Sequence, residues 1–282
     1  MKITEKAMLV RLKISQWTAR RFDFKATKKL IEDHGAKHDS GRFNKMLVDN
    51  IEVKKYQHAA SEARVFHYEN TLPWGDDNVR ILPSDNYLAY TQKMRELKSK
   101  FEKAYSEFIE EYPALIEKAE NDLSGLFSAR DYPAAWELES KFAFDIHVTP
   151  VPTANDFRVS LSDDDLNRIK SDIEADVKDS IVMAMGVAWK RLFTAVKHMA
   201  VKLADDDAVF RNSLIGNIAE LCDLLPRLNI TNDPKLTEII GDARKALVPL
   251  DPKDLRDKQI DRKKATVKAK AVLEKMTAYM GD

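Results

Sequence analysis

Residues 162–204 read SDDDLNRIKSDIEADVKDSIVMAMGVAWKRLFTAVKHMAVKLA, and this stretch decides the fold. Ser162 and the three aspartates after it predict a helix start, because Ser caps free amides and carboxylates favour the positive end of a helix. Only Gly186 weakens the apolar pattern that follows. A helix of about forty residues spans roughly 60 Å and needs a partner along its whole apolar stripe. That stripe consists of Leu166, Ile169, Ile173, Val177, Ile181, Ala184, Ala188, Leu192, Val196, Met199 and Leu203.

A second long helix is predicted from Ser84 onward. Its apolar residues recur at helical spacing as far as Phe108 and again from Leu115. Pro113 stands between the two parts, and proline disfavours helix in the residue before it. We therefore expect a kink or a short break near Tyr112. We also expect the two long helices to fold back on each other as an antiparallel pair.

Residues 7–17 alternate between apolar and polar side chains, which predicts a strand with one buried face. Residues 142–148 and 157–161 alternate in the same way, and a rigid proline-containing connector separates them. We therefore predict a mainly α fold with a small β-sheet (α+β), in which a sheet of about three strands caps an elongated antiparallel hairpin of long helices. The predicted domains are an N-terminal α/β segment that contributes a strand to the sheet (1–82), two long helices joined by a hairpin-like β segment (83–205), and C-terminal helices (206–282).

Shorter helices are predicted around these elements. A basic helix over residues 25–33 ends before Gly35, a residue that favours the left-handed conformation of a helix cap. Another helix is expected over residues 43–66. After the central helix, aspartates mark three further starts, because Asp caps amides and Pro fits the first helical turn. These starts are Asp205-Asp206-Asp207, Asp233-Pro234 and Asp251-Pro252.

The composition excludes several classes of protein. The 46 basic residues balance the 46 acidic ones, so no global field favours nucleic acid or a membrane surface. The single Cys222 rules out a disulfide framework and a thiolate metal cluster, and its apolar helical surroundings predict burial. No apolar run approaches the roughly 18 residues of a membrane span, and the first residues are too charged for a signal peptide. We therefore expect a cytoplasmic protein that does not contact membrane.

The sequence contains no recognisable catalytic motif. A phosphate-binding loop, a dinucleotide-binding fingerprint and a nucleophile elbow are all absent, and only eight glycines are present. We therefore expect no enzyme, no cofactor and no metal. His34 and His38 have the spacing of metal ligands on one helix face, but the helix is expected to end between them, which favours a solvated turn. Helix capping explains the two aspartate triplets, Asp163–Asp165 and Asp205–Asp207.

An irregular segment contains Trp74, Asp76 and Asp77. Functional residues concentrate in such segments, so these three residues form a candidate functional loop. One hypothesis is a divalent-metal enzyme that uses Asp76 and Asp77. The alternative is an ordinary tight turn.

Basic residues and aromatic residues interleave near the N-terminus, where Phe22 and Phe24 lie among them. Such a pattern could follow a phosphate backbone and stack nucleobases. The alternative is a solvated strand face and helix face with the aromatic side chains in the core. A second basic cluster, residues 262–270, could bind a phosphate backbone in the same way. The alternative for this cluster is a polar helix of mixed charge. The candidate nucleic-acid-binding residues are Arg11, Lys13, Trp17, Arg20, Arg21, Lys25, Lys28 and Lys29.

Several short runs between residues 8 and 205 form a distinctive set. They are ISQWTARR (14–21), SGRFNK (40–45), LPWGDD (72–77), RILP (80–83), YP (112–113), DYP (131–133), FAF (142–144), PVP (150–152) and DFRV (156–159). With these runs the chain resembles a phage- and plasmid-encoded family known only as domain of unknown function 3150. The resemblance transfers no activity and no catalytic residue. It implies a bacterial host cytoplasm and, by genomic association, a companion AAA+ ATPase of the MoxR or CobS type.

Two functions follow as expectations. The first is a non-enzymatic interaction protein of a mobile element, acting as an adaptor, a scaffold or a self-assembling component. Its partner would be a protein, such as that AAA+ ATPase, or a second copy of the chain. The second is a nucleic-acid-binding protein that uses the basic N-terminal residues, and its affinity would fall steeply with salt.

Overall fold

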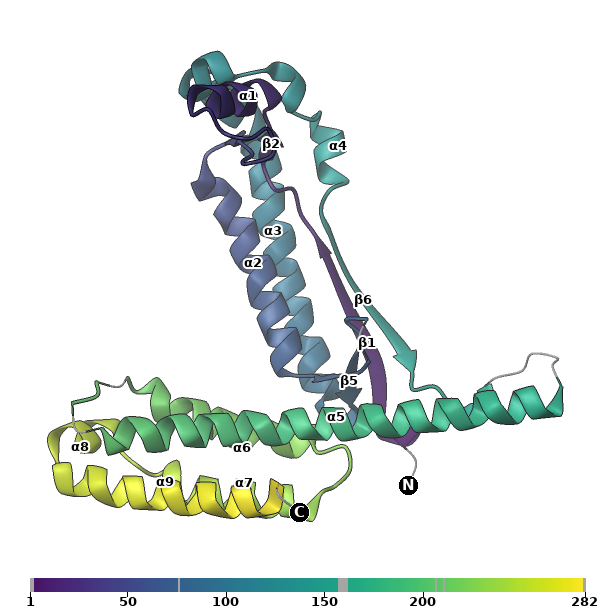
Figure 1. Ribbon diagram of the computed structural model, residues 1–282, viewed down its shortest axis with the longest axis vertical. Coiled ribbons are helices and arrows are strands. Elements are labelled where there is room, and N and C mark those ends of the chain that lie inside the picture. Colours follow the sequence, from purple (N-terminus) through teal and green to yellow (C-terminus); the bar gives the residue numbers. More distant parts are fainter. Residues whose placement is uncertain (1–2, 76, 157–161, 206, 210, 281–282) are drawn as a thin grey trace. The chain divides into compact units, whose positions relative to one another are not determined.

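The computed structural model is mostly helical, with a small four-stranded sheet and a separate pair of strands (Figure 1). This arrangement confirms the mainly α class with a small sheet. The structure describes residues 3–75, 77–156, 162–205, 207–209 and 211–280.

The contacts divide the chain into two compact units. The predicted domains are consecutive segments, whereas these units interleave along the sequence, because two strands and two helices each pass from one unit to the other. Unit 1 comprises Met1–Arg11, Tyr68–Tyr90 and His147–Asp282, and unit 2 comprises Leu12–His67 and Thr91–Ile146.

The main sheet has the strand order β4-β5-β1-β6. Strand β5 pairs antiparallel with both β4 and β1, and Leu9 lies opposite Ile81 in the β1–β5 register. The predicted strands at 7–17 and 142–148 are therefore confirmed, but the described sheet has four strands rather than about three. The predicted strand at residues 157–161 lies outside the described residues. The four strands are β1 (Ala7–Ser15), β4 (Leu72–Pro73), β5 (Arg80–Pro83) and β6 (Ala143–Pro150).

The core of unit 1 forms around the helix that the central stretch predicts. This helix, α5, runs over 42 residues, and the Ser162 side chain caps the amide of Asp165. From Ala184 to Leu203 its stripe is buried against α9, α6 and α7. The helices of this part are α5 (Asp163–Ala204), α6 (Ser213–Leu228), α7 (Pro234–Leu247), α8 (Pro252–Asp257) and α9 (Gln259–Met280).

Two of the three predicted aspartate starts hold in the structure. Asp233 and Asp251 each cap the helix that begins at the following proline. The prediction for Asp205 is wrong, because this residue ends α5 and α6 begins only at Ser213. An aspartate caps either a helix or a turn, and here the Asp205 carboxylate accepts from the amide of Asp207.

Two arginines of unit 1 hold the last carbonyl groups of α2 (Asn50–Glu69). Arg191 donates to the carbonyls of Tyr68, Glu69 and Thr71 at 2.6–2.8 Å. Arg80 donates to the Tyr68 carbonyl at 3.3 Å and to the Thr71 carbonyl at 2.9 Å. Burial and the neighbouring Arg191 lower the pKa of Arg80 to about 10. The negative end of the helix stabilises both guanidinium groups, so this pair has a structural role.

The core of unit 2 is aromatic. The Tyr56 ring meets Phe108 and Phe142 edge-on at 5.2 and 5.1 Å, and Trp17 meets Tyr112 edge-on at 5.7 Å. The Tyr56 hydroxyl donates to the Trp17 carbonyl at 2.9 Å. Unit 2 also holds β2 (Arg20–Phe22), α1 (Phe24–Asp33), β3 (Asn44–Met46), α4 (Ala135–Glu139) and most of α2 and α3 (Ser84–Leu123). Short 3₁₀ turns lie at Ser124–Leu126 and Ala129–Asp131 in unit 2 and at Ile3–Glu5 and Ala154–Asp156 in unit 1.

The predicted antiparallel pair of long helices is wrong. Most of α3 belongs to unit 2 and α5 to unit 1, and each helix buries apolar side chains within its own unit. The expected break near Tyr112 is also absent, since α3 continues through Pro113. The buried Tyr112 donates to the Pro133 carbonyl at 3.1 Å, so tertiary packing holds the turn in which proline removes a donor.

The predicted helix over residues 43–66 is correct only in its second part. Residues Asn44–Met46 form β3, and α2 begins at Asn50. By contrast, the basic helix 25–33 is confirmed as α1, and Gly35 after it has a positive φ of 56°.

Candidate nucleic-acid interface

Residues 20–46 fold into a β2–α1–β3 module within unit 2. Strands β2 and β3 pair antiparallel, with Arg20 opposite Met46 and Arg21 opposite Lys45. Directly opposed side chains lie on the same face of a strand pair, and neighbours along a strand lie on opposite faces. Arg21 and Lys45 therefore share one face, called the inner face, and Arg20 shares the other with Phe22.

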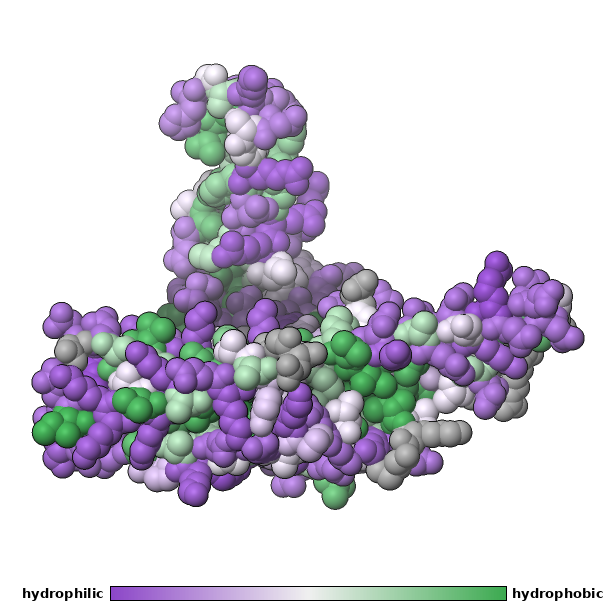
Figure 2. All heavy atoms as spheres, turned by 60° about the horizontal axis from the view of Figure 1, so that its bottom comes forward, coloured by the Kyte–Doolittle hydropathy of each residue, from purple (hydrophilic) through white to green (hydrophobic). Residues whose placement is uncertain are grey.

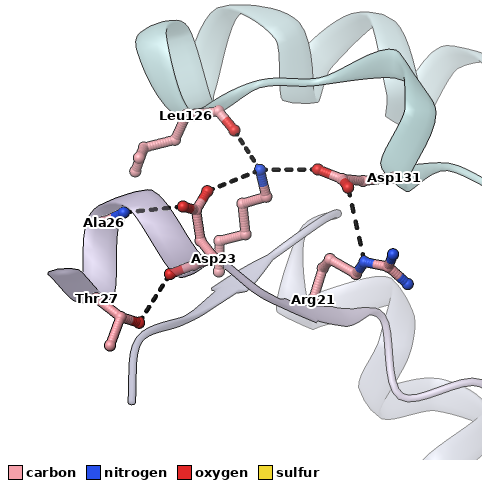
Figure 3. Close-up of polar contacts among 7 residues, drawn as sticks. Arg21, Asp23, Ala26, Thr27, Leu126 and Asp131 are labelled. Carbon is pink, nitrogen blue, oxygen red and sulfur yellow. Dashed lines mark hydrogen bonds and ion pairs between the residues drawn. The ribbon is translucent and has the colours of Figure 1, made fainter. Parts of the chain in front are cut away.

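The inner face is held by a buried ammonium group (Figure 3). The Lys45 side chain is 6% exposed, and its Nζ lies 2.8 Å from a carboxylate oxygen of Asp131 and 3.1 Å from one of Asp23. It also donates to the Leu126 carbonyl at 2.6 Å. Arg21 lies 3.7 Å from the second oxygen of Asp131. These contacts tie the module to the segment that follows α3.

Asp23 connects this ion-pair network to α1. Its carboxylate caps the helix by accepting from the amide of Ala26 at 2.9 Å. Its carbonyl accepts from the Thr27 hydroxyl at 2.7 Å, and the same hydroxyl accepts from the amide of Phe43 at 2.9 Å. The start of α1 is thus fixed to β3, so the module presents a defined surface.

Lys45 is not an activated lysine. Burial lowers its pKa, but the hydrogen bonds with Asp131 and Asp23 outweigh that effect and raise the pKa above its usual value. The amide of Ala26 and then the Lys45 ammonium lower the pKa of Asp23. A lysine nucleophile or base needs the opposite shift, toward the neutral amine. The cluster is therefore a structural anchor.

The face opposite this anchor is open, basic and aromatic. Lys25, Lys28 and Lys29 follow the three-and-four spacing that places side chains on one face of a helix, and all three are exposed. Phe22 and Phe24 are 44% and 60% exposed, although such side chains are usually buried. We call Arg20, Phe22, Phe24, Lys25, Lys28, Lys29 and Arg42 the basic aromatic face.

A hollow of about 420 Å³ opens on this face. Phe22, Phe24 and Ile31 give it apolar walls, and Lys28 and Arg42 supply positive charge at the same hollow. The carboxylates of Glu32 and Asp39 also line it. The Arg42 guanidinium lies 5.9 Å from the centre of the Phe22 ring. Aromatic walls with neighbouring cations suit a flat, phosphate-bearing group such as a nucleotide.

The charge balance of the module supports this assignment. Residues 20–46 contain eight basic and four acidic side chains, whereas the whole chain is neutral. Asp23 is occupied by Lys45, and Glu32 lies 3.7 Å from Lys28 at the exposed surface. An excess of positive charge therefore remains for a polyanion.

The structure brings some of the predicted basic residues together and separates others. Arg20, Arg21, Lys25, Lys28 and Lys29 all belong to the module, although Arg21 lies on its inner face.

Three further candidates lie outside the module. Trp17 is 8% exposed in the aromatic core of unit 2, so it does not present a ring for stacking. Arg11 and Lys13 are exposed on β1, and Arg11 belongs to unit 1. Arg42 is the member of the face that sequence reasoning missed, because twelve residues separate it from Lys29 and only the β2–β3 pairing returns it to Phe22.

The second candidate, the loop at Trp74, has the features of a tight turn. Trp74 is 8% exposed within the core of unit 1, and its amide donates to the Val79 carbonyl at 3.1 Å. Gly75 and Asn78 have positive φ values of 59° and 56°. Asp77 is exposed, and Asp76 lies outside the described residues. Within the described part of the chain, no group of three or more His, Cys, Asp or Glu side chains could hold a metal.

The other polar features have structural explanations. Arg262, the first residue of the second basic cluster, is 7% exposed and donates to carbonyls at the end of α5. His34 lies at the cap after α1, so His34 and His38 do not share a helix face. Cys222 is fully buried as predicted, and burial raises the pKa of its thiol to about 11.

Comparisons with protein-family models, with curated proteins and with solved structures give no match to this chain. Among the described residues, none of the helices combines the length and apolar character that a bilayer span requires.

Proposed function

We propose that the protein is a non-enzymatic binding protein that holds single-stranded nucleic acid on the basic aromatic face. The observation that carries this proposal is the exposure of Phe22 and Phe24 beside the lysine row of α1. The exposed rings stack nucleobases, and Lys25, Lys28 and Lys29 pair with successive phosphates. Every base has a flat face, so binding depends little on sequence.

The first prediction concerns salt. If four or five phosphates are contacted, single-strand affinity falls about 50- to 130-fold when salt rises from about 50 to about 200 mM, because bound cations are released. Reversing three charges in Lys25→Glu/Lys28→Glu/Lys29→Glu should abolish most of the binding and flatten the salt dependence. Fluorescence anisotropy with labelled oligo-dT, oligo-U and a duplex of equal length measures both effects.

A matched control reverses three exposed lysines of α9, in Lys263→Glu/Lys264→Glu/Lys268→Glu, and should bind like the wild type. Phe22→Ala/Phe24→Ala should lose at least about fivefold in affinity and keep the salt slope, because stacking is not ionic. Absence of binding at low salt, or full binding by this phenylalanine variant, would contradict stacking on the face. Equal loss in both lysine variants would indicate a general charge effect instead.

A second candidate function is protein interaction, and the first half of α5 favours it. No side chain between Asp163 and Met183 is fully buried, and the stripe residues Leu166, Ile169 and Ile173 are half-buried. Val177 and Ile181 pack against the core of unit 1. In the part of the chain that the structure describes, the stripe residues before them do not belong to this core. In Figure 1 these first turns extend to the right past the end of α9. We call residues 163–183 the acidic arm.

The charge of the acidic arm indicates its partner. It contains seven acidic and three basic residues, and its end is largely hydrophilic on the face in Figure 2. An apolar stripe with acidic flanks is complementary to a basic amphipathic helix, which we propose as the partner. The acidic flanks argue against a second copy of the arm. An adaptor of this kind could serve a AAA+ ATPase, a suggestion that rests on the family resemblance alone.

The second prediction tests the arm with a synthetic helical peptide built from leucine and lysine. The variant Ile169→Asp/Ile173→Asp should bind this peptide at least about tenfold more weakly than the wild type, because it places charges in the apolar stripe. Ile260→Asp/Val267→Asp changes two exposed apolar residues of α9 and should bind normally. A leucine–glutamate peptide should not bind. Equal peptide affinity for both variants would refute the assignment.

A further inference from the structure

A small pocket lies between α5 and α6 in unit 1, and none of its described lining residues belongs to the basic aromatic face, the Trp74 loop or the acidic arm. Its volume is about 230 Å³. Its polar lining consists of His198, Lys202, Arg211, Ser213 and Asn217.

Hydrogen-bond donors reach this pocket from three segments. His198 and Lys202 are one turn apart on α5, so they lie on the same face of that helix. Ser213 and Asn217 are one turn apart on α6, and Arg211 lies in the connection before it. The lining therefore combines an ammonium, a guanidinium, an imidazole, a hydroxyl and an amide around one small volume.

Among the residues that the structure describes, the cations of the pocket have no counter-charge. None of the described lining residues is a carboxylate, and in this part of the chain the side chains of Lys202 and Arg211 form no ion pair or hydrogen bond. Asp205 and Asp207 occur in the same connection, but neither lines the pocket. Cations held close together without a counter-charge repel each other, and a bound anion removes that repulsion.

We propose that this pocket binds the phosphate group of a ligand. The oxygens of a phosphate accept from the Lys202 ammonium, the Arg211 guanidinium, the Ser213 hydroxyl and the Asn217 amide, and charge-assisted hydrogen bonds of this kind are the strong ones. A single phosphate group fits the volume, whereas the pocket is too small to enclose a complete nucleotide. The inference is independent of the basic aromatic face, which lies in the other unit.

The phosphate has two possible sources that share this chemistry. One is a free phosphate ester, and the other is the backbone of a nucleic acid. Isothermal titration with sodium phosphate, at an ionic strength held constant with sodium chloride, tests the shared chemistry first. Oligonucleotide binding by the pocket variants then distinguishes the sources.

The wild-type protein should bind phosphate, and Lys202→Gln/Arg211→Gln should bind it at least about tenfold more weakly, since two charged hydrogen bonds are lost. Asn217→Asp keeps the size of an exposed side chain and places a carboxylate in the pocket, so it should also block binding without affecting folding. Lys263→Gln/Lys264→Gln removes two exposed cations elsewhere and should bind normally.

No phosphate binding by the wild type, or unchanged binding by Asn217→Asp, would overturn the proposal. If the wild type binds phosphate and Lys202→Gln/Arg211→Gln lowers the affinity for the oligonucleotide, the phosphate is that of a nucleic-acid backbone. Unchanged oligonucleotide affinity in that variant, with phosphate binding lost, assigns it to a free phosphate ester. Failure of the basic aromatic face to bind single strands leaves the phosphate titration unaffected, so the two proposals are tested separately.

Discussion

Replacing Lys45 by methionine should destabilise unit 2 by about 3 kcal/mol. Removing one partner of a buried ion pair costs about 3–5 kcal/mol because the other charge stays buried. The lower end applies here, since Asp23 and Asp131 keep 15% and 16% of their side-chain surface exposed. Native-state hydrogen exchange of residues 20–46, together with urea unfolding, measures the loss.

The effect of Lys45→Met should depend on pH in a defined direction. The pKa of Asp23 is lowered below its ordinary value of 3.8, so its contribution is present above that value and is lost as pH falls through the folded pKa. The pKa of Lys45 is raised above 10.5, so its contribution is lost only as pH rises through that higher folded value. The difference between wild type and variant should therefore be largest near neutral pH and shrink below about pH 4.

Lys118→Met provides the control for this prediction. Lys118 also pairs with an aspartate in unit 2, at 2.7 Å from Asp49, but its side chain is 55% exposed. Exposed ion pairs contribute little, so this variant should unfold like the wild type. If Lys45→Met were equally silent, or if its effect persisted unchanged in acid, the buried ammonium would not anchor the module.

The second large effect is expected at Arg262, where replacement by alanine should destabilise unit 1 by about 3 kcal/mol. Its guanidinium donates to the carbonyls of Lys202 at 2.9 Å, Ala208 at 3.1 Å and Leu203 at 3.2 Å, and also to that of Asp205. A hydrogen bond to a charged group contributes about 1.5–3 kcal/mol, so the predicted loss corresponds to one or two such bonds, and the carbonyls at a helix end need a partner. Urea unfolding and hydrogen exchange of the last turns of α5 measure the change.

Arg262→Lys separates charge from geometry. Lysine keeps the positive charge but cannot span several carbonyls as a planar guanidinium does, so it should recover only part of the lost stability. Lys263→Ala changes the exposed neighbour and should leave stability unchanged. Full stability of Arg262→Lys would show that charge alone is sufficient. Full stability of Arg262→Ala would show that the α5 end does not need this cap.

The candidate site was predictable only in part. Lys25, Lys28 and Lys29 share a helix face by spacing alone, so their common exposure follows from the sequence. Arg21 and Trp17 belong to the same basic, aromatic run, yet Trp17 is buried in the core, whereas Arg21 stays exposed beside Asp131 on the inner face. Spacing gives the direction of a side chain within its own element, whereas the neighbouring element decides whether that direction leads to solvent.

The sequence by itself determined several of the helices and their caps. The α5 helix, its Ser162 cap and the Asp-Pro starts of α7 and α8 follow from local chemistry, because a cap satisfies amides within three residues. The β1 strand follows from its alternation.

Only the tertiary structure decided which elements pack together. The apolar stripes of the two long helices predict that each helix needs a packing partner, but they do not predict which element that partner is. In the structure α5 packs on α9, while most of α3 belongs to the other unit. Lys45 lies in a run that reads as helix, yet pairing with β2 and the carboxylates of Asp23 and Asp131 makes it a buried strand residue. Those partners are distant in sequence, and no local pattern encodes contacts that form only after the chain has folded.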